Sequence, residues 1–121
     1  MEIKDLISNP SPLFEKIGDF ARKAGRVTTR PLLLLYFVLK SKDTPASDKL
    51  IIVSTLAYVV LPVDLISAKR LPIIGWIDEV ASVAVAIEKV GKYITPEIEM
   101  QTDDQLNKWF GTEYEVITTV D

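Results

Sequence analysis

Three carboxylates flank a proline-rich turn in the middle of the 121-residue sequence. Asp64 follows Pro62 closely, and Asp78 and Glu79 stand at the expected start of a later helix. Carboxylate oxygens are ligands that Mg²⁺ and Ca²⁺ prefer, so one hypothesis is a small divalent-cation site formed by Asp64, Asp78 and Glu79. A structural interpretation needs no cation, because Asp64 can accept backbone N–H bonds in the turn and acids are stabilised near a helix N-terminus. We favour the structural interpretation, since these cations usually need more oxygens than three side chains provide.

The sequence offers little for catalysis. It contains no histidine and no cysteine, so it lacks the usual near-neutral general base, a thiol nucleophile and thiolate metal ligands. A serine nucleophile elbow and a phosphate-cradling glycine loop are also missing. Tyr36 and Tyr58 could donate protons, but core tyrosines with a hydrogen-bonded hydroxyl are much more common. We therefore expect a protein that is not an enzyme.

Helix start and stop residues predict an all-α fold. Ser or Thr followed by Pro is typical of an N-cap and the first helical turn, and apolar residues recur at helical spacing after each such start. Pro62 and Pro96 should end the helices that precede them. The expected bundle has four helices and a short fifth: Ser11 to Gly25, Thr29 to about Lys40, Pro45 to about Leu61, about Trp76 to Tyr93, and a segment capped by Thr102.

The third and fourth of these helices form an apolar hairpin, which we expect at the centre of the bundle. Between Leu50 and Leu61 the only polar side chains are Ser54, Thr55 and Tyr58, so this helix should be buried on nearly all sides. Residues 80–87 are apolar and small. A buried strand is the alternative there, but the alanines and the length of the run favour a helix.

Residues 32–92 contain several short motifs at fixed spacings. They are a Thr-Pro helix start, a turn that reads Tyr…Pro-x-Asp-Leu-Ile, and a Pro-x-x-Gly-x-x-Asp-Glu entry to the next helix. Together they resemble the YkvA-like family, a domain of unknown function (number 1232). Ser67 and Ala68 stand where the family usually has Pro and Asp, and Glu79 replaces the second Asp of the family's final pair. The matching residues are Tyr58, Pro62, Asp64, Leu65, Ile66, Pro72, Gly75, Asp78 and Glu79.

The resemblance implies membrane association, because families of this kind are commonly predicted to be membrane-associated. A helix from Pro45 to Leu61 would rise about 25 Å, against about 30 Å for the hydrocarbon core of a bilayer. A hairpin seated in one leaflet or lying on the surface therefore fits better than two full spans. The alternative is that other helices bury the hairpin as a soluble core, and we lean slightly towards it.

The N-terminal part of the chain is basic and the C-terminal part is acidic, which limits the kinds of partner that we expect. Residues 1–42 hold eight Lys and Arg against four acids, whereas residues 95–121 hold one Lys against seven acids. The N-terminal bases could meet anionic lipid, an acidic protein or the chain's own acidic end, although a solvated helix face is the simplest interpretation. They are Lys16, Arg22, Lys23, Arg26 and Arg30.

The remaining expectations concern domains, partners and location. We expect residues 1–96 to form the helical domain and residues 97–121 to form an acidic tail with a short helix. A pI near 5.0 without a recognition motif argues against nucleic acid, which leaves a membrane surface, a protein partner or a homodimer. The N-terminus lacks the basic start and apolar run of a signal peptide. We therefore expect an intracellular protein, either cytoplasmic or at the membrane.

Overall fold

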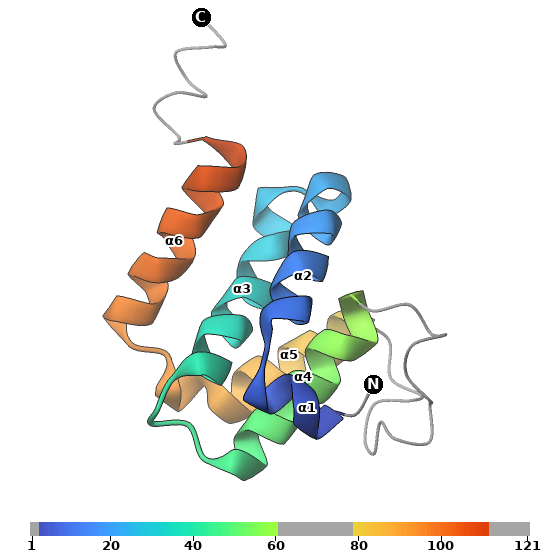
Figure 1. The fold of residues 1–121 in the computed structure, drawn as a ribbon. Coiled ribbons are helices and arrows are strands. Elements are labelled where there is room, and N and C mark those ends of the chain that lie inside the picture. Colours follow the sequence, from blue (N-terminus) through green and yellow to red (C-terminus); the bar gives the residue numbers. More distant parts are fainter. Residues whose placement is uncertain (1–2, 61–78, 112–121) are drawn as a thin grey trace, which may run out of the picture.

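The described part of the chain is entirely helical. A computed structural model of the protein describes residues 3–60 and 79–111, and within these ranges it contains six α-helices, one short 3-10 helix and no strand. The all-α prediction is therefore confirmed (Figure 1). The elements are α1 (Ile3–Ser8), α2 (Ser11–Ala24), α3 (Arg26–Lys40), α4 (Ala46–Val60), α5 (Glu79–Val90), η3 (Gly91–Tyr93) and α6 (Pro96–Phe110).

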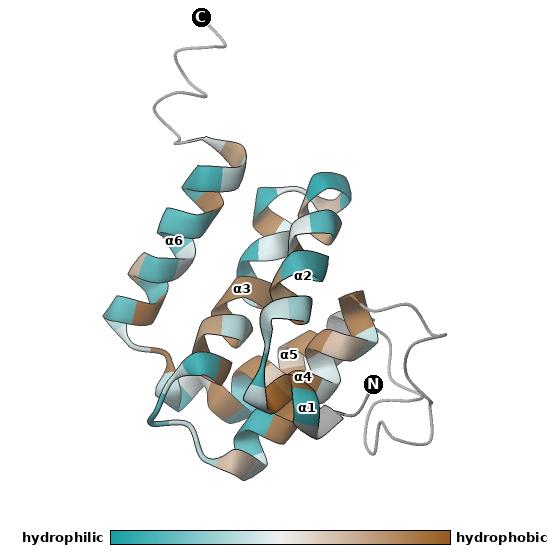
Figure 2. Ribbon diagram, in the orientation of Figure 1, coloured by the Kyte–Doolittle hydropathy of each residue, from teal (hydrophilic) through white to brown (hydrophobic). Residues whose placement is uncertain are grey.

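Two helices, α3 and α4, share the centre of the bundle. Helix α3 contacts α2, α4, α5 and α6, and helix α4 contacts α1, α2, α3 and α5. Residues 32–36 of α3 and residues 52–57 of α4 are buried in succession, and such runs exceed one helical turn. These stretches in the middle of each helix are therefore enclosed by neighbouring helices. Hydrophobic residues accordingly concentrate in α4, α5 and the adjoining half of α3, whereas α2 and α6 are largely hydrophilic (Figure 2).

The predicted hairpin is present as two packed helices. Helices α4 and α5 contact each other along the bundle, and residues 79–90 are helical rather than extended. Helix α4 ends at Val60, close to the predicted end at Leu61. The predicted start of the second arm, near Trp76, lies outside the described residues.

Helix α3 begins earlier than the sequence predicted. It starts at Arg26, directly after Gly25, so Thr29 and Pro31 lie inside the helix instead of at its start. Gly25 has φ 86° and ψ 174°, a conformation that glycine alone adopts readily, and it ends α2 and starts α3 at one residue. The Thr29 hydroxyl donates to the Gly25 carbonyl at 2.7 Å. Pro31 removes the hydrogen bond to the Val27 carbonyl, which is tolerated because Val27 is 86% exposed and water can replace the donor.

Two further predicted caps are wrong. Thr44 is buried, and its hydroxyl donates to the Val38 carbonyl at 2.8 Å, which ties the end of α3 to the loop that follows it. The Lys49 N–H instead bonds the Pro45 carbonyl, so Pro45 precedes α4 and Ala46 begins it. Ser11 likewise is the first residue of α2, and the cap position is held by Pro10.

Helix α6 is much longer than the predicted short helix. Thr95 is its N-cap and accepts a hydrogen bond from the Ile98 N–H at 3.2 Å, and Pro96 occupies the first helical position. Pro96 thus begins a helix in addition to following one. Thr102 is not a cap, because it is buried within α6 and its hydroxyl donates to the Ile98 carbonyl at 2.9 Å.

The acidic helix α6 covers α3 and binds two of its arginines. Ile98, Thr102 and Leu106 are buried at helical spacing against the bundle. The Arg30 Nε lies 3.1 Å from an Asp103 carboxylate oxygen, which forms an ion pair between the two helices. Arg26 donates to the Asn107 side-chain oxygen at 2.8 Å and to the Gly111 carbonyl at 3.0 Å. Two of the five N-terminal bases therefore contact the C-terminal part of the chain.

Candidate functional site

The predicted turn lies almost wholly outside the described residues. Pro62, Asp64, Leu65, Ile66, Pro72, Gly75 and Asp78 belong to residues 61–78. Glu79 is the first residue of α5, but its side chain is also outside the description. Tyr58, near the end of α4, is partly buried. Within residues 3–60 and 79–111 no group of three or more His, Cys, Asp or Glu side chains could hold a metal ion. The cation site thus remains a hypothesis from the sequence.

An apolar groove opens where α2, α3, α4 and α5 meet. It encloses about 670 Å³, which falls within the range of about 300–1,000 Å³ typical of small-molecule sites. Apart from Thr28 and Glu88, its lining is apolar, so water inside it finds few hydrogen-bond partners. The lining residues are Phe20, Thr28, Pro31, Leu32, Val59, Val83, Ala84, Ile87 and Glu88.

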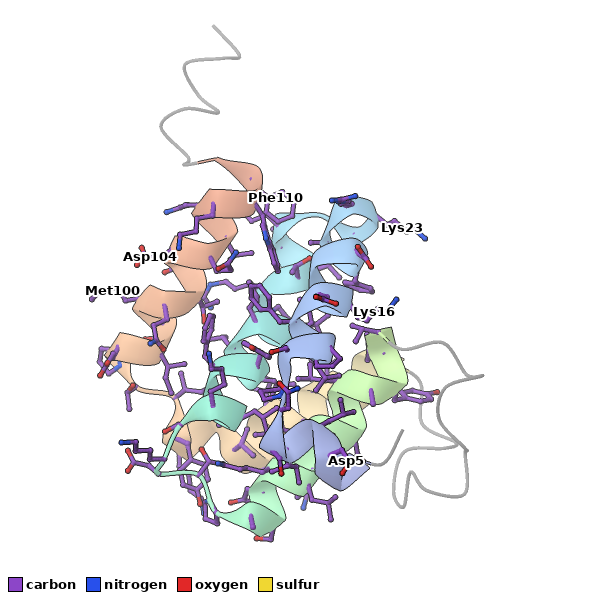
Figure 3. The ribbon with its side chains drawn as sticks, in the orientation of Figure 1. Asp5, Lys16, Lys23, Met100, Asp104 and Phe110 are labelled. Carbon is purple, nitrogen blue, oxygen red and sulfur yellow. The ribbon has the colours of Figure 1, made fainter. Side chains whose placement is uncertain are left out.

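A smaller hollow adjoins this groove and has charged residues in its wall. It encloses about 280 Å³ and shares Phe20 and Val59 with the groove. Its other lining residues include Lys16, Asp19 and Lys23 of α2. The two lysines are seven residues apart, which places them on one face of the helix. Figure 3 shows both side chains projecting from α2 towards the same side as the end of α4.

These two lysines differ from the arginines of the same basic cluster. Arg26 and Arg30 bond residues of α6 or its end, as described above. Lys16 and Lys23 form no ion pair with any of the described residues. The ammonium groups beside the apolar groove are therefore available to an anion.

A second pocket lies between α2 and the end of α6. It encloses about 590 Å³, with Phe14, Trp109 and Phe110 in its wall together with charged residues of both signs. The Phe14 and Trp109 rings are 5.3 Å apart, and Figure 3 shows Phe110 at the top of α6 beside α2. Gly18 faces this ring, and a Cβ there would make ordinary van der Waals contact with Trp109 at 3.4 Å. Because the aromatic rings pack on one another and on Gly18, we interpret them as the contact that holds α6 to α2.

The groove could not be found from the sequence alone. Its residues come from four helices, and each belongs to an apolar stretch that also supplies the core. Ala84 and Val85 are exposed although they lie in the most apolar part of α5, and an apolar helix with an uncovered side indicates a surface that another molecule can cover.

Two tyrosines have a raised pKa, and for Tyr93 the main cause is a hydrogen bond with the Asp48 side chain. Burial raises the pKa of Tyr36, whose ring packs 5.1 Å from the ring of Phe14. A tyrosine in this state keeps its proton at neutral pH, which suits a core residue and gives no nucleophile or base.

None of the helices in the described ranges has both the length and the apolar composition needed to cross a bilayer.

The fold and the groove together define a small all-α bundle built on a helical hairpin, with an apolar groove that no residue of the described ranges covers. The family model described as "Protein of unknown function (DUF1232)" matches residues 48–85, which confirms the family recognised in the sequence. The matched residues take in most of α4, the first half of α5 and the residues between them. No curated protein and no solved structure gives a significant match to the chain.

Proposed function

We propose that this protein is a non-enzymatic module that attaches reversibly to anionic membrane surfaces through the open side of its hairpin. The observation that carries the proposal is the apolar groove between α5 and the α2–α3 pair, which none of the described residues covers. The middle of α4 is enclosed by neighbouring helices. The groove and its rim therefore supply the apolar contact with lipid.

Exposed apolar side chains extend the groove outwards. Val27 is 86% exposed and directly precedes Thr28, which lines the groove. Val85 is 39% exposed and directly follows Ala84, another lining residue. Single exposed valines are common on soluble proteins, but two beside an apolar groove enlarge one continuous patch. Each valine that enters the interface with lipid contributes about 25 cal/mol for every Å² of apolar surface removed from water.

The charges at the same end of the bundle suit an anionic surface. Lys16 and Lys23 stand beside the groove, and a lysine near an anionic leaflet contributes about 1 kcal/mol. This attraction weakens with salt, because exposed charges are screened within about 10 Å at 0.1 M ionic strength. The combination of an apolar insertion and a few lysines predicts weak, reversible and salt-sensitive binding.

Vesicle flotation of the intact chain tests the proposal. We expect the protein to float with vesicles that contain phosphatidylglycerol, to float less at 0.5 M salt, and to remain unbound with pure phosphatidylcholine. Val27→Asp should weaken flotation, and it should not disturb folding, because an acid is favourable in the first turn of α3.

Met100→Asp is the matched control. Met100 is 63% exposed on the outer side of α6, away from the groove (Figure 3). This variant introduces the same charge change at an exposed apolar position and should float like the unchanged chain. Absence of flotation with all vesicles, or an equal loss in both variants, would refute the proposed function.

A further inference from the structure

We propose that the groove binds one long-chain fatty acid, with its hydrocarbon tail between α3 and α5 and its carboxylate beside Lys16 and Lys23. This inference rests on the proposed function, because it names a lipid that binds in the same groove. It follows from the size, the lining and the charge of two adjoining hollows.

The groove has the size and the lining of a site for a hydrocarbon tail. Its volume is about 670 Å³, and Pro31, Leu32, Val83 and Ile87 are among the side chains that face it. No described residue places a cationic group in this wall. A tail gains about fourfold in affinity for each methylene that it buries, so long chains should bind much more tightly than short ones.

The neighbouring hollow fits the charged end of the same molecule. Phe20 and Val59 line both hollows, so a tail that passes these side chains brings its head group to Lys16 and Lys23. Asp19 also lines the hollow, which leaves an excess of one positive charge there. An ammonium–carboxylate hydrogen bond is stronger than a neutral one, so the head should be an anion and not an alcohol.

The acid at the opposite wall fixes the orientation. Glu88 lies on α5, whereas both lysines lie on α2. A carboxylate placed at the α5 wall would face a like charge, whereas one placed at the α2 wall would face two ammonium groups and one carboxylate, a net positive charge. The tail therefore points towards α5 and the carboxylate towards α2.

Binding of palmitate, below its aggregation concentration and without membranes, tests the inference on the full chain. We expect saturable binding of one palmitate for each chain in a fluorescent fatty-acid displacement assay or by calorimetry. Laurate, with four fewer methylenes, should bind at least tenfold more weakly. Hexadecanol, which keeps the tail and lacks the charge, should also bind at least tenfold more weakly than palmitate. Equal binding of acid and alcohol would overturn the assigned role of the lysines.

Two pairs of variants locate the ligand. Ala84→Phe places a large side chain on an exposed groove residue, and we expect a tenfold or greater loss of palmitate binding. Met100→Phe makes the same kind of change at an exposed position of α6, outside the groove lining, and should leave binding unchanged. The double variant Lys16→Gln, Lys23→Gln should lower palmitate affinity to that of hexadecanol. Lys108→Gln, a lysine of α6 outside both hollows, is its control.

The outcomes separate this inference from the proposed function. Vesicle flotation without any binding of palmitate would overturn the fatty-acid site and leave the membrane proposal intact. Palmitate binding without flotation would support the site and refute membrane attachment. Concentration-dependent dimerisation that is abolished by Ala84→Phe would overturn the inference, because a second copy of the chain would then occupy the groove.

Discussion

Gly25 joins α2 to α3. Replacing it measures the free energy that any other residue loses by adopting the backbone conformation of this junction. Its φ of 86° and ψ of 174° lie in a region that only glycine populates freely. A Cβ at this position would meet no atom within 4 Å, so replacement by alanine introduces backbone strain without a side-chain clash. Strain of this kind costs about 1–3 kcal/mol. The alanine also restricts the unfolded chain, which returns about 0.4–1 kcal/mol.

We therefore expect Gly25→Ala to lower the free energy of unfolding by roughly 1–2 kcal/mol. At roughly 4 °C for each kcal/mol in a chain of this size, the melting temperature should fall by about 4–8 °C. Urea unfolding followed by circular dichroism measures the free energy, and a thermal melt checks the temperature.

Gly91→Ala is the matched control for this prediction. A Cβ at Gly91 likewise meets nothing within 4 Å, and its φ is not positive. Only the effect on the unfolded chain remains, so this variant should be neutral or more stable by about 0.4–1 kcal/mol. The difference between the two variants isolates the strain. Equal stability of the two would show that the junction at Gly25 can adopt an ordinary conformation, and the reasoning would fail.

Four further predictions test the core, a buried hydroxyl, the link to α6 and the buried tyrosine. Leu33 is fully buried, so Leu33→Ala should cost about 2–5 kcal/mol in urea unfolding, and a loss below about 1 kcal/mol would contradict its place in the core. The Ser54 hydroxyl is buried and has no hydrogen-bond partner in the described part of the chain, so Ser54→Ala should raise the free energy of unfolding by about 1 kcal/mol; a loss would indicate a partner. A double-mutant cycle on Arg30 and Asp103, which are partly exposed, should give a coupling of about 0.2–1 kcal/mol that falls with salt. Burial raises the pKa of Tyr36, so the protonated tyrosine contributes to stability below the ordinary tyrosine range near pH 10. This contribution is lost as the pH rises through the raised pKa. Tyr36→Phe should therefore reduce the loss of stability at alkaline pH, measured by unfolding at a series of pH values.

The sequence predicted the apolar helices well because their signal is strong and local. Residues 50–61 and 80–87 are apolar over a length that favours a helix over a strand, and both segments are helical where the structure describes them. The family motifs were equally clear, since several fixed spacings had to agree at once. Recognition of the fold class therefore needed no tertiary information.

Helix starts were predicted less well because threonine can serve two purposes. Thr29 and Thr102, both expected as caps, lie inside helices and donate to carbonyls four residues earlier. This internal hydrogen bond competes with capping, and nothing in the local sequence separates the two. Thr44 differs again, because its partner Val38 belongs to the preceding helix. Whether a threonine caps a helix depends on where the chain turns. Contacts with residues that are distant in sequence determine that position.

The groove and the extent of α6 were beyond prediction for the same reason. Apolar residues of α5 gave no indication of which would be covered by α3 and which would remain open. Residues 96–110 are mostly polar and looked like a tail, yet three buried positions on one face suffice to dock them on α3. Which face of a helix is covered depends on how all the helices pack together, so the residue pattern of one helix does not predict it.

The docking of α6 on α3 has a consequence for how the molecule is made. Arg30 and Asp103 are 73 residues apart in the chain, and the two helices that carry them form one of the main contacts of the bundle. Contacts between distant segments form late, because a long loop must close first. During synthesis, the side of α3 that faces α6 therefore stays uncovered until α6 has been made. Until then its apolar surface is open to chaperones and to other copies of the chain, so the vulnerable interval ends only when residue 110 has emerged.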